Sequence, residues 1–357
     1  MTRAKGQARY AKKRRTRTRH TILKRTLTGI GVALAAGVVG LGVFLIGIQG
    51  LLGQGLDANL FGVLSDSSIN QPFYMLLLGT DKSSEREQSA DFGTSDSAYR
   101  TDSMILARLD PPAKKVTLIS IERDTLVDMG EYGEQKINAA YSLGGPALAV
   151  QEVSELADVP ISHYAEINFD EFISVVDGIG GIDVNIKVDL HDSYADLDIK
   201  AGEQTLDGTT ALALCRARHA YEDYGGGDYY RAANQRMIIG AIVKKVLASN
   251  PMAIAGSMTT LADSVTTDLT LQEIIALARA YQGFDPSQDL YSGLEPTTSK
   301  YINGGWYDIV DEKAWHAMMQ RVDAGLSPYK DASEDFTLDV AGGDSAYANP
   351  GEDSSSS

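Results

Sequence analysis

The sequence predicts an α/β fold, in which helices cover both faces of a mixed β-sheet, preceded by one N-terminal transmembrane helix. Two observations lead to this prediction. Short apolar segments that indicate strands alternate along the chain with longer segments of helical periodicity. A long apolar segment without charge lies near the N-terminus, directly after a basic stretch.

The predicted transmembrane helix rests on the segment from Leu27 to Ile48, which is almost wholly apolar. A helix rises about 1.5 Å per residue, so roughly 20 residues cross a bilayer core. Residues 1–25 contain eleven Lys or Arg and no acid. Because basic flanks stay in the cytoplasm, we expect a cytoplasmic N-terminus and an extracytoplasmic body. A cleaved signal peptide is the alternative, although its apolar region is typically shorter, about 7–15 residues.

The charge of the chain is divided unevenly. The 357 residues carry a net charge of −16, yet after residue 25 there are 21 basic and 48 acidic residues, a net of −27. An acidic body repels phosphate backbones, so no nucleic-acid partner is expected. The basic N-terminal stretch is better explained by contact with anionic membrane lipid. A single cysteine, Cys215, excludes an intrachain disulfide.

Five segments follow from composition. They are a basic cytoplasmic tail at 1–25, a membrane anchor at 26–49, a linker at 50–71, a folded extracytoplasmic domain at 72–330 and a disordered acidic tail at 331–357. In the folded domain, apolar runs predict strands at Phe73–Leu78, Ser103–Leu109, Val116–Ile121, His163–Asn168 and Ile182–Ile186. Helices are expected near Pro146–Ala157, Phe169–Asp177, Gly208–Cys215, Ala232–Ala248 and Leu271–Tyr281. The Pro-containing turn between the second and third strands predicts a hairpin, and hence a mixed sheet.

Two carboxylates are candidate metal ligands. Asp81 follows the first strand, and Asp102 enters the second. Ligand sites in α/β sheets favour strand ends, and Mg²⁺ takes oxygen ligands of this kind. From spacing alone, a solvated loop residue and a turn cap explain the two side chains as well.

Arginines at junctions of loops and helices form a second group. Arg123 follows a strand, Arg216 and Arg218 follow a predicted short helix, and Arg231 ends a Gly-rich stretch that we interpret as a flexible loop. Arg makes bidentate contacts with phosphate oxygens, so the pattern favours an anionic ligand. Ion pairing with nearby acids is the competing explanation.

Other chemistries find no support. The residues after Cys215 do not form a phosphate-binding loop, so we expect a small core residue there. The sequence contains no HExxH and no GxxxxGK[ST] motif. The acidic stretch from Asp189 to Asp198 lacks EF-hand spacing and is expected to be a solvated loop.

Taken in order, seven segments resemble the LytR–CpsA–Psr family. They are LLLGTD (76–81), RTDSM (100–104), VTLISIERDT (116–125), KINAAYSLGG (136–145), AEINFDEFISVVDGIGGIDVNI (165–186), LDGTTALALCRAR (206–218) and GDYYRAANQR (227–236), with the best match at 73–249. The resemblance implies an α/β/α domain and a phosphotransferase. Its substrate is a glycopolymer on a polyprenyl-pyrophosphate carrier, and its acceptor is a muramic acid hydroxyl of peptidoglycan. The implied cofactor is Mg²⁺, with Mn²⁺ as an alternative.

The resemblance also implies roles for individual residues. Asp81 and Asp102 are similar to the metal-binding carboxylates, and Asp228 to a residue that orients arginines. Arg123 and Asp124 are the expected catalytic pair, with Asp124 helping to deprotonate the acceptor. The expected pyrophosphate-binding residues are Arg100, Arg123, Lys136, Arg216, Arg218, Arg231 and Gln235.

Two departures and two alternatives accompany the resemblance. A polar insertion occupies 82–99, and Glu122 stands where the family pattern leads us to expect proline. A surface protein could replace peptidoglycan as the acceptor. A membrane-bound regulator that senses polyprenyl phosphates without turnover is an alternative from another class.

Overall fold

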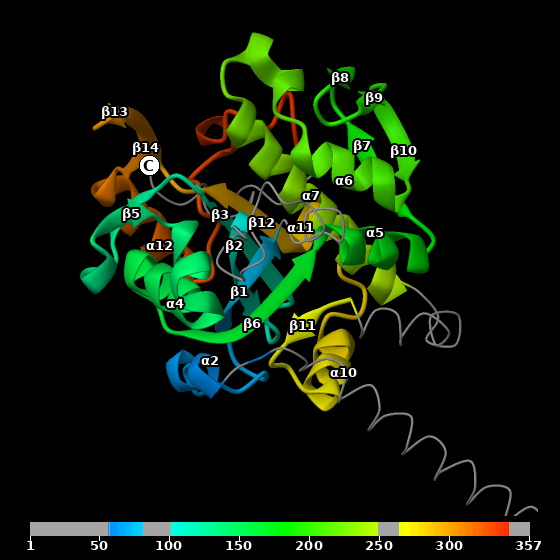
Figure 1. The fold of residues 1–357 in the computed structure, drawn as a ribbon. Helices are drawn as coiled ribbons and strands as arrows, with labels where there is room; N and C mark the ends of the chain where they lie inside the picture. The colour runs from blue at the N-terminus through cyan, green and yellow to red at the C-terminus, as the bar shows by residue number, and fades with distance from the viewer. Residues whose placement is uncertain (1–55, 57, 81–100, 249–263, 343–357) are drawn as a thin grey trace, which may run out of the picture. The chain divides into compact units, whose positions relative to one another are not determined.

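A computed structural model describes residues 56, 58–80, 101–248 and 264–342 of the chain (Figure 1). The predicted membrane anchor at 26–49, Asp81, Arg100 and the insertion at 82–99 lie outside the described residues. Within the described ranges, no helix combines the length and the apolar character needed to cross a bilayer.

A six-stranded mixed sheet in the order β11-β6-β1-β2-β3-β12 forms the centre of the described domain (Figure 1). Its strands are β1 (Phe73–Thr80), β2 (Thr101–Asp110), β3 (Lys115–Ile121), β6 (Ile161–Asn168), β11 (Thr266–Thr267) and β12 (Leu290–Leu294). β2 pairs antiparallel with β1 and with β3, whereas β6 pairs parallel with β1 and β12 pairs parallel with β3. The predicted mixed sheet and its hairpin are therefore confirmed.

Helices cover both faces of this sheet because successive side chains of its strands point to opposite sides. On one face, Leu76 of β1 packs in a core with helices α4 (Ala139–Ala157) and α12 (Glu312–Asp323). On the other face, Met75 packs in a second core with α7 (Gly227–Ala248) and α10 (Leu271–Ala280). The predicted α/β/α layering is confirmed.

A third core lies around the other side of α7. Its elements are α5 (Phe169–Gly178), β7 (Ile182–Ile186), β8 (Leu190–Asp192), β9 (Leu197–Ile199), β10 (Gly202–Leu206), α6 (Gly208–Arg216) and the 3₁₀ helix η3 (His219–Tyr224). The predicted strand β7 is present, but it pairs with β10 in a separate sheet. The remaining elements are α2 (Ala58–Val63), β4 (Leu126–Asp128), η2 (Gly130–Tyr132), β5 (Glu134–Lys136), α11 (Pro286–Asp289), β13 (Thr297–Ile302), β14 (Gly305–Val310) and η4 (Ala332–Glu334).

Three expectations are corrected. The Gly-rich segment before Arg231 is not a loop throughout, because α7 already begins at Gly227. The acidic stretch at 189–198 is not a solvated loop, since β8 and β9 pair and Asp192 is buried. Residues 331–342 are not a disordered tail: Ala341 belongs to the third core, and the Gly342 N–H donates to Asn234.

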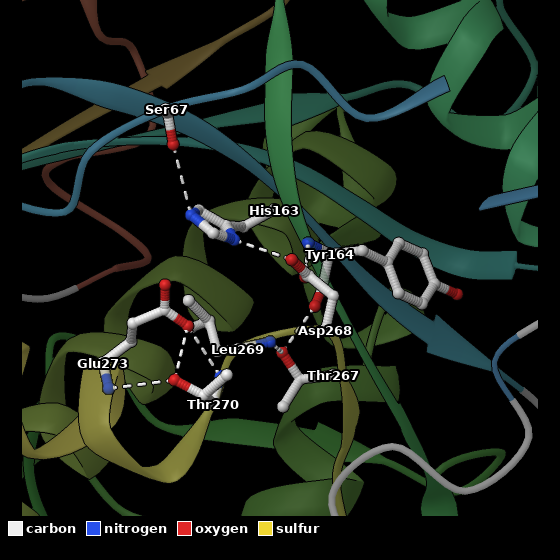
Figure 2. Close-up of polar contacts among 8 residues, drawn as sticks. All are labelled: Ser67, His163, Tyr164, Thr267, Asp268, Leu269, Thr270 and Glu273. Carbon is white, nitrogen blue, oxygen red and sulfur yellow. Dashed lines mark hydrogen bonds and ion pairs between the residues drawn. The ribbon is translucent and has the colours of Figure 1, made fainter. Parts of the chain in front are cut away.

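A polar network fixes β11 and α10 to the edge strand β6 (Figure 2). Asp268 accepts hydrogen bonds from the Tyr164 N–H at 2.6 Å and contacts Nδ1 of His163 at 2.7 Å (Figure 2). Ser67 lies 3.3 Å from the other ring nitrogen of His163. Thr270 then caps α10 in a capping box with Glu273. These contacts fix the position of β11 and α10 relative to β6.

Candidate active site

Four segments meet where β2 begins and β3 ends: these strand ends, the N-terminus of α7 and the end of α6. Thr80, the residue before Asp81, pairs with Thr101, the residue before Asp102. Arg123 lies just past β3, and its Nη1 contacts Oδ1 of Asp102 at 3.3 Å. The structure therefore brings Asp102 and Arg123 together, as the predicted site requires.

Carboxylates keep Arg123 charged. Burial alone would lower the pKa of Arg123, but Asp228, Asp124 and Asp102 together raise it above its ordinary value. The guanidinium is thus a permanent cation that three acids from three different segments surround. Such a cation is suited to hold a pyrophosphate in place.

The first turn of α7 supplies the second arginine. Nη2 of Arg231 lies 3.0 Å from Oδ1 of Asp228, one helical turn earlier. Asp228 therefore contacts an arginine directly, and its orienting role stays a prediction. Gly227 starts the helix against the Arg218 carbonyl, and a Cβ at Gly227 would lie only 2.4 Å from that oxygen. A side chain here would push Arg218 away from α7.

Gln235, expected to orient the arginines or to complete the pyrophosphate site, makes two polar contacts. Its Oε1 accepts a hydrogen bond from Ser103 at 2.9 Å, and its Nε2 donates to the Cys215 carbonyl at 3.0 Å. Gln235 therefore joins the residue after Asp102 to the residue before Arg216. We interpret it as a positioning residue rather than a pyrophosphate ligand.

Arg216 and Arg218 are both exposed, and Ala217 between them is buried. Arg216 is the last residue of α6, and its guanidinium lies 5.2 Å from the centre of the Phe169 ring, whereas Arg218 follows extended Ala217. Buried Asp192 holds this segment by accepting from the backbone N–H groups of Arg218 at 3.0 Å and His219 at 2.8 Å. Burial alone would raise the pKa of Asp192, but these and other backbone donors lower it.

Lys136 and Asp124 pair with each other. Nζ of Lys136 lies 3.0 Å from Oδ1 of Asp124 and 5.5 Å from the centre of the Tyr307 ring. The Asp308 N–H donates to the Asp124 carbonyl at 2.9 Å. Burial and then Asp124 raise the pKa of Asp308. Strand β14 thereby adds a further carboxyl group that the sequence did not suggest.

Glu122 and Glu295 are two buried acids close to the arginines. Burial, followed by Asp228, Asp308 and Glu295, raises the pKa of Glu122 to about 8. Burial raises the pKa of Glu295 to about 7. Oε2 of Glu295 accepts from the Glu122 N–H at 2.8 Å. Proline has no N–H and could not make this bond, so the bond requires a residue other than proline at position 122.

Two guanidinium N–H groups lack a partner among the described residues. The Nε–H groups of Arg123 and Arg231 are buried and donate to no acceptor there. A buried donor without an acceptor costs about 1–3 kcal/mol, so such groups call for an explanation. Because these two atoms have no contact with solvent, an anion could reach the two arginines only at the exposed parts of their side chains, which are 24% and 11%.

Only one of the two expected metal ligands, Asp102, lies among the described residues. Among the described residues, no group of three or more His, Cys, Asp or Glu side chains could hold a metal ion. The Asp102 side chain is 36% exposed and lies at the start of β2, whereas Asp81, the other expected ligand, is outside the described residues. Hard oxygen donors of this type suit Mg²⁺, which keeps several waters in its coordination shell.

Comparison with known proteins defines the class. A family described as "LytR_cpsA_psr family" matches residues 56–324. The chain therefore belongs to the LytR–CpsA–Psr family, and the resemblance noted from its motifs is confirmed.

One relative and two solved structures show how close the match is. The Polyisoprenyl-teichoic acid–peptidoglycan teichoic acid transferase TagU of Enterococcus faecalis is 35% identical over 71% of this chain and 79% of its own. The crystal structure of Bacillus subtilis TagV is 29% identical over 70% of this chain and 96% of TagV, with a TM-score of 0.59. The structure of a TagT protein with bound octaprenyl pyrophosphate lipid matches 73% of this chain and 93% of the TagT chain, with a TM-score of 0.54. Its sequence identity is 20%, so this likeness supports the fold alone.

Proposed function

We propose that this chain is a membrane-anchored, extracytoplasmic phosphotransferase. It moves a glycopolymer phosphate from a polyprenyl-pyrophosphate carrier to a muramic acid hydroxyl of peptidoglycan. Membership of the family and the transferase name of TagU support this proposal. The observation that carries it is the placement of two partly exposed arginines, Arg123 past the end of β3 and Arg231 in the first turn of α7, by ion pairs with Asp102 and Asp228.

In the proposed reaction the acceptor oxygen attacks the phosphorus that bears the glycan. A new P–O bond forms to the acceptor, the P–O bond to the carrier breaks, and polyprenyl phosphate leaves. Arg123 and Arg231 bind the phosphate oxygens from below, and exposed Arg216 and Arg218 add positive charge at the rim. Catalysis of this kind depends on positioning and on neutralising charge.

The acceptor hydroxyl must lose a proton to a base in the site. Asp124 is the expected base, and it is partly accessible beside Lys136. Mg²⁺, which Asp102 and Asp81 would hold, supplies further positive charge to the phosphates when bound. The polyprenyl chain would need an apolar surface outside the packed cores of the domain.

The test uses the full chain in detergent with a polyprenyl-pyrophosphate-linked sugar, peptidoglycan fragments and Mg²⁺. Mass spectrometry should find a sugar-phosphate adduct on the fragments that EDTA abolishes. Arg123→Ala should lower the rate of adduct formation about 100-fold or more. Arg279 is exposed, and Arg279→Ala should leave this rate unchanged. An adduct on protein instead would identify a surface-protein acceptor. Lipid binding without any adduct would refute transfer and favour a sensor.

A further inference from the structure

Strands β13 and β14 form a hairpin beside the candidate site (Figure 1, orange). Its turn has only two residues, Asn303 and Gly304, which both have positive φ, at 50° and 93°. Two such residues are characteristic of a type I′ turn, whose backbone twist matches that of the paired strands. The hairpin therefore holds its side chains in a defined arrangement up to its tip.

Two aromatic side chains lie exposed at this tip. Tyr301 and Trp306 are directly opposite each other in the strand register, with ring centres 5.4 Å apart at an angle of 62°. They are 63% and 60% exposed. Because side chains alternate along a strand, Ser299 and Asp308 share this face, and the Ser299 hydroxyl donates to Asp308 at 2.5 Å.

The same face continues to the candidate site. Asp308 lies two residues from Trp306, about 7 Å along the strand, which is on the scale of one sugar ring. Its backbone joins the site through a parallel bridge to Thr125 and a hydrogen bond to the Asp124 carbonyl. Tyr229, in the first turn of α7, lies beside Ser299. The hairpin thus links the exposed rings to the residues around Asp124.

We propose that Tyr301 and Trp306 form a stacking subsite for the sugar rings of the acceptor glycan. The subsite rests on the proposed function. It would bind a sugar next to the acceptor muramic acid in the same glycan chain and guide it toward Asp308. A sugar presents a C–H face that stacks on aromatic rings and hydroxyl edges that bind carboxylates, and this hairpin face offers both.

The composition of the face favours a glycan over other partners. Two isolated rings between Ser299 and Asp308 cover too little apolar area for docking of a protein core. The Asp308 carboxylate repels an anionic membrane surface, and alternation places Lys300 on the opposite face. Exposed aromatic rings with an adjacent acid remain suited to a neutral sugar ring, such as the N-acetylglucosamine next to the muramic acid acceptor.

Tryptophan fluorescence tests the subsite directly. The chain has two tryptophans, and Trp315 is buried with its Nε1–H bound to the Leu156 carbonyl, so changes in emission report on Trp306. We expect oligosaccharides of alternating N-acetylglucosamine and N-acetylmuramic acid to shift the emission of the full chain in detergent. Trp306→Ala should abolish the response, and Tyr301→Ala should weaken the affinity about tenfold. Phe61→Ala, which removes a 57% exposed ring, should have no effect.

A binding assay and a transfer assay together distinguish the proposed stacking subsite from the proposed phosphotransferase activity. A saccharide response that depends on Trp306 supports the subsite even if no adduct forms in the transfer assay. In an active enzyme, Trp306→Ala should raise the acceptor KM about tenfold and leave the donor KM unchanged. Transfer with an unchanged acceptor KM in Trp306→Ala would overturn the subsite and leave the phosphotransferase intact. Emission that responds to anionic vesicles and not to saccharides would overturn it in favour of a membrane contact.

Discussion

Single guanidinium groups determine what the candidate site can bind. Arg231 has one nitrogen against Asp228 and a buried Nε with no partner among the described residues. A lysine at this position would keep the charge but lose the planar set of donors. We expect Arg231→Lys to lower the transfer rate by about 100- to 1,000-fold, measured by adduct formation. Arg279→Lys serves as the matched control, and comparable rates in both variants would contradict the role of Arg231.

Glu122 should give the stability of the domain a distinctive pH dependence. Its pKa is raised to about 8, first by burial and then by Asp228, whereas an unfolded glutamate has a pKa of about 4.3. The folded state therefore binds more protons between these values, so its contribution to stability falls as pH rises through this window.

Glu122→Gln removes this contribution. Relative to the wild type, the variant should gain about 2–4 kcal/mol in unfolding free energy between pH 4 and pH 9. Urea denaturation at several pH values measures the difference. Parallel stability curves would show that Glu122 is ionised in the folded state.

Short elements depend on a few buried acceptors. Asp192 ends β8 and accepts from the backbone at the start of η3, next to Arg218. Asp192→Asn places an NH₂ group among N–H donors, so we expect a loss of about 2–4 kcal/mol in unfolding free energy. The lowered pKa of Asp192 means that its contribution is present above the unfolded pKa and is lost as pH falls through the folded one.

A matched control is available on the same hairpin. Asp189 has a side chain that is 61% exposed, so Asp189→Asn should change stability little. Thermal denaturation of the two variants at neutral pH makes the comparison. Equal losses in both would mean that the buried hydrogen bonds of Asp192 do not hold the segment.

The contacts of Asp268 that join β6 to β11 are a second example of a short element held by a buried acceptor. Asp268 contacts both His163 and the Tyr164 N–H (Figure 2). Asp268→Ala leaves these buried groups unsatisfied and should cost about 2–3 kcal/mol, measured by chemical denaturation. Ser67 is exposed, so Ser67→Ala should be nearly neutral. A large effect of Ser67→Ala would show that the serine is needed to hold the imidazole in place.

Segments far apart in the chain meet to complete the described domain. Residues 335–342 lie against α7. Ala341 belongs to the third core, and the Gly342 N–H donates to the Asn234 side chain. A chain that ends at residue 330 loses these contacts and should melt roughly 5–10 °C lower. A chain that ends at residue 342 is the control and should keep the melting temperature. Equal melting of the two truncated chains would argue against a structural role for this segment.

Local patterns were enough to predict much of the fold. The apolar runs of β1, β2 and β3 and the turn after Asp110 are sequence-local features, and they specify the antiparallel half of the sheet. The α7 boundary was wrong, because a Gly-rich start resembles a loop unless its contact with the Arg218 backbone is known. Strands β12, β13 and β14 and helix α12 were not predicted. β12 joins the sheet only by pairing with β3, which precedes it by more than a hundred residues.

The sequence by itself determined the family, the mixed sheet and the residues that carry charge at strand and helix ends. These features depend on residue type, order and period, which any stretch of chain displays before it folds. Only the tertiary structure decided which charges pair, which acids are buried and which aromatic rings remain exposed. The pairing of Arg123 with Asp102, the burial of Asp192 and Glu122, and the place of Trp306 beside the site all depend on contacts between distant segments. The dielectric and the hydrogen-bond partners of a side chain are set by those contacts.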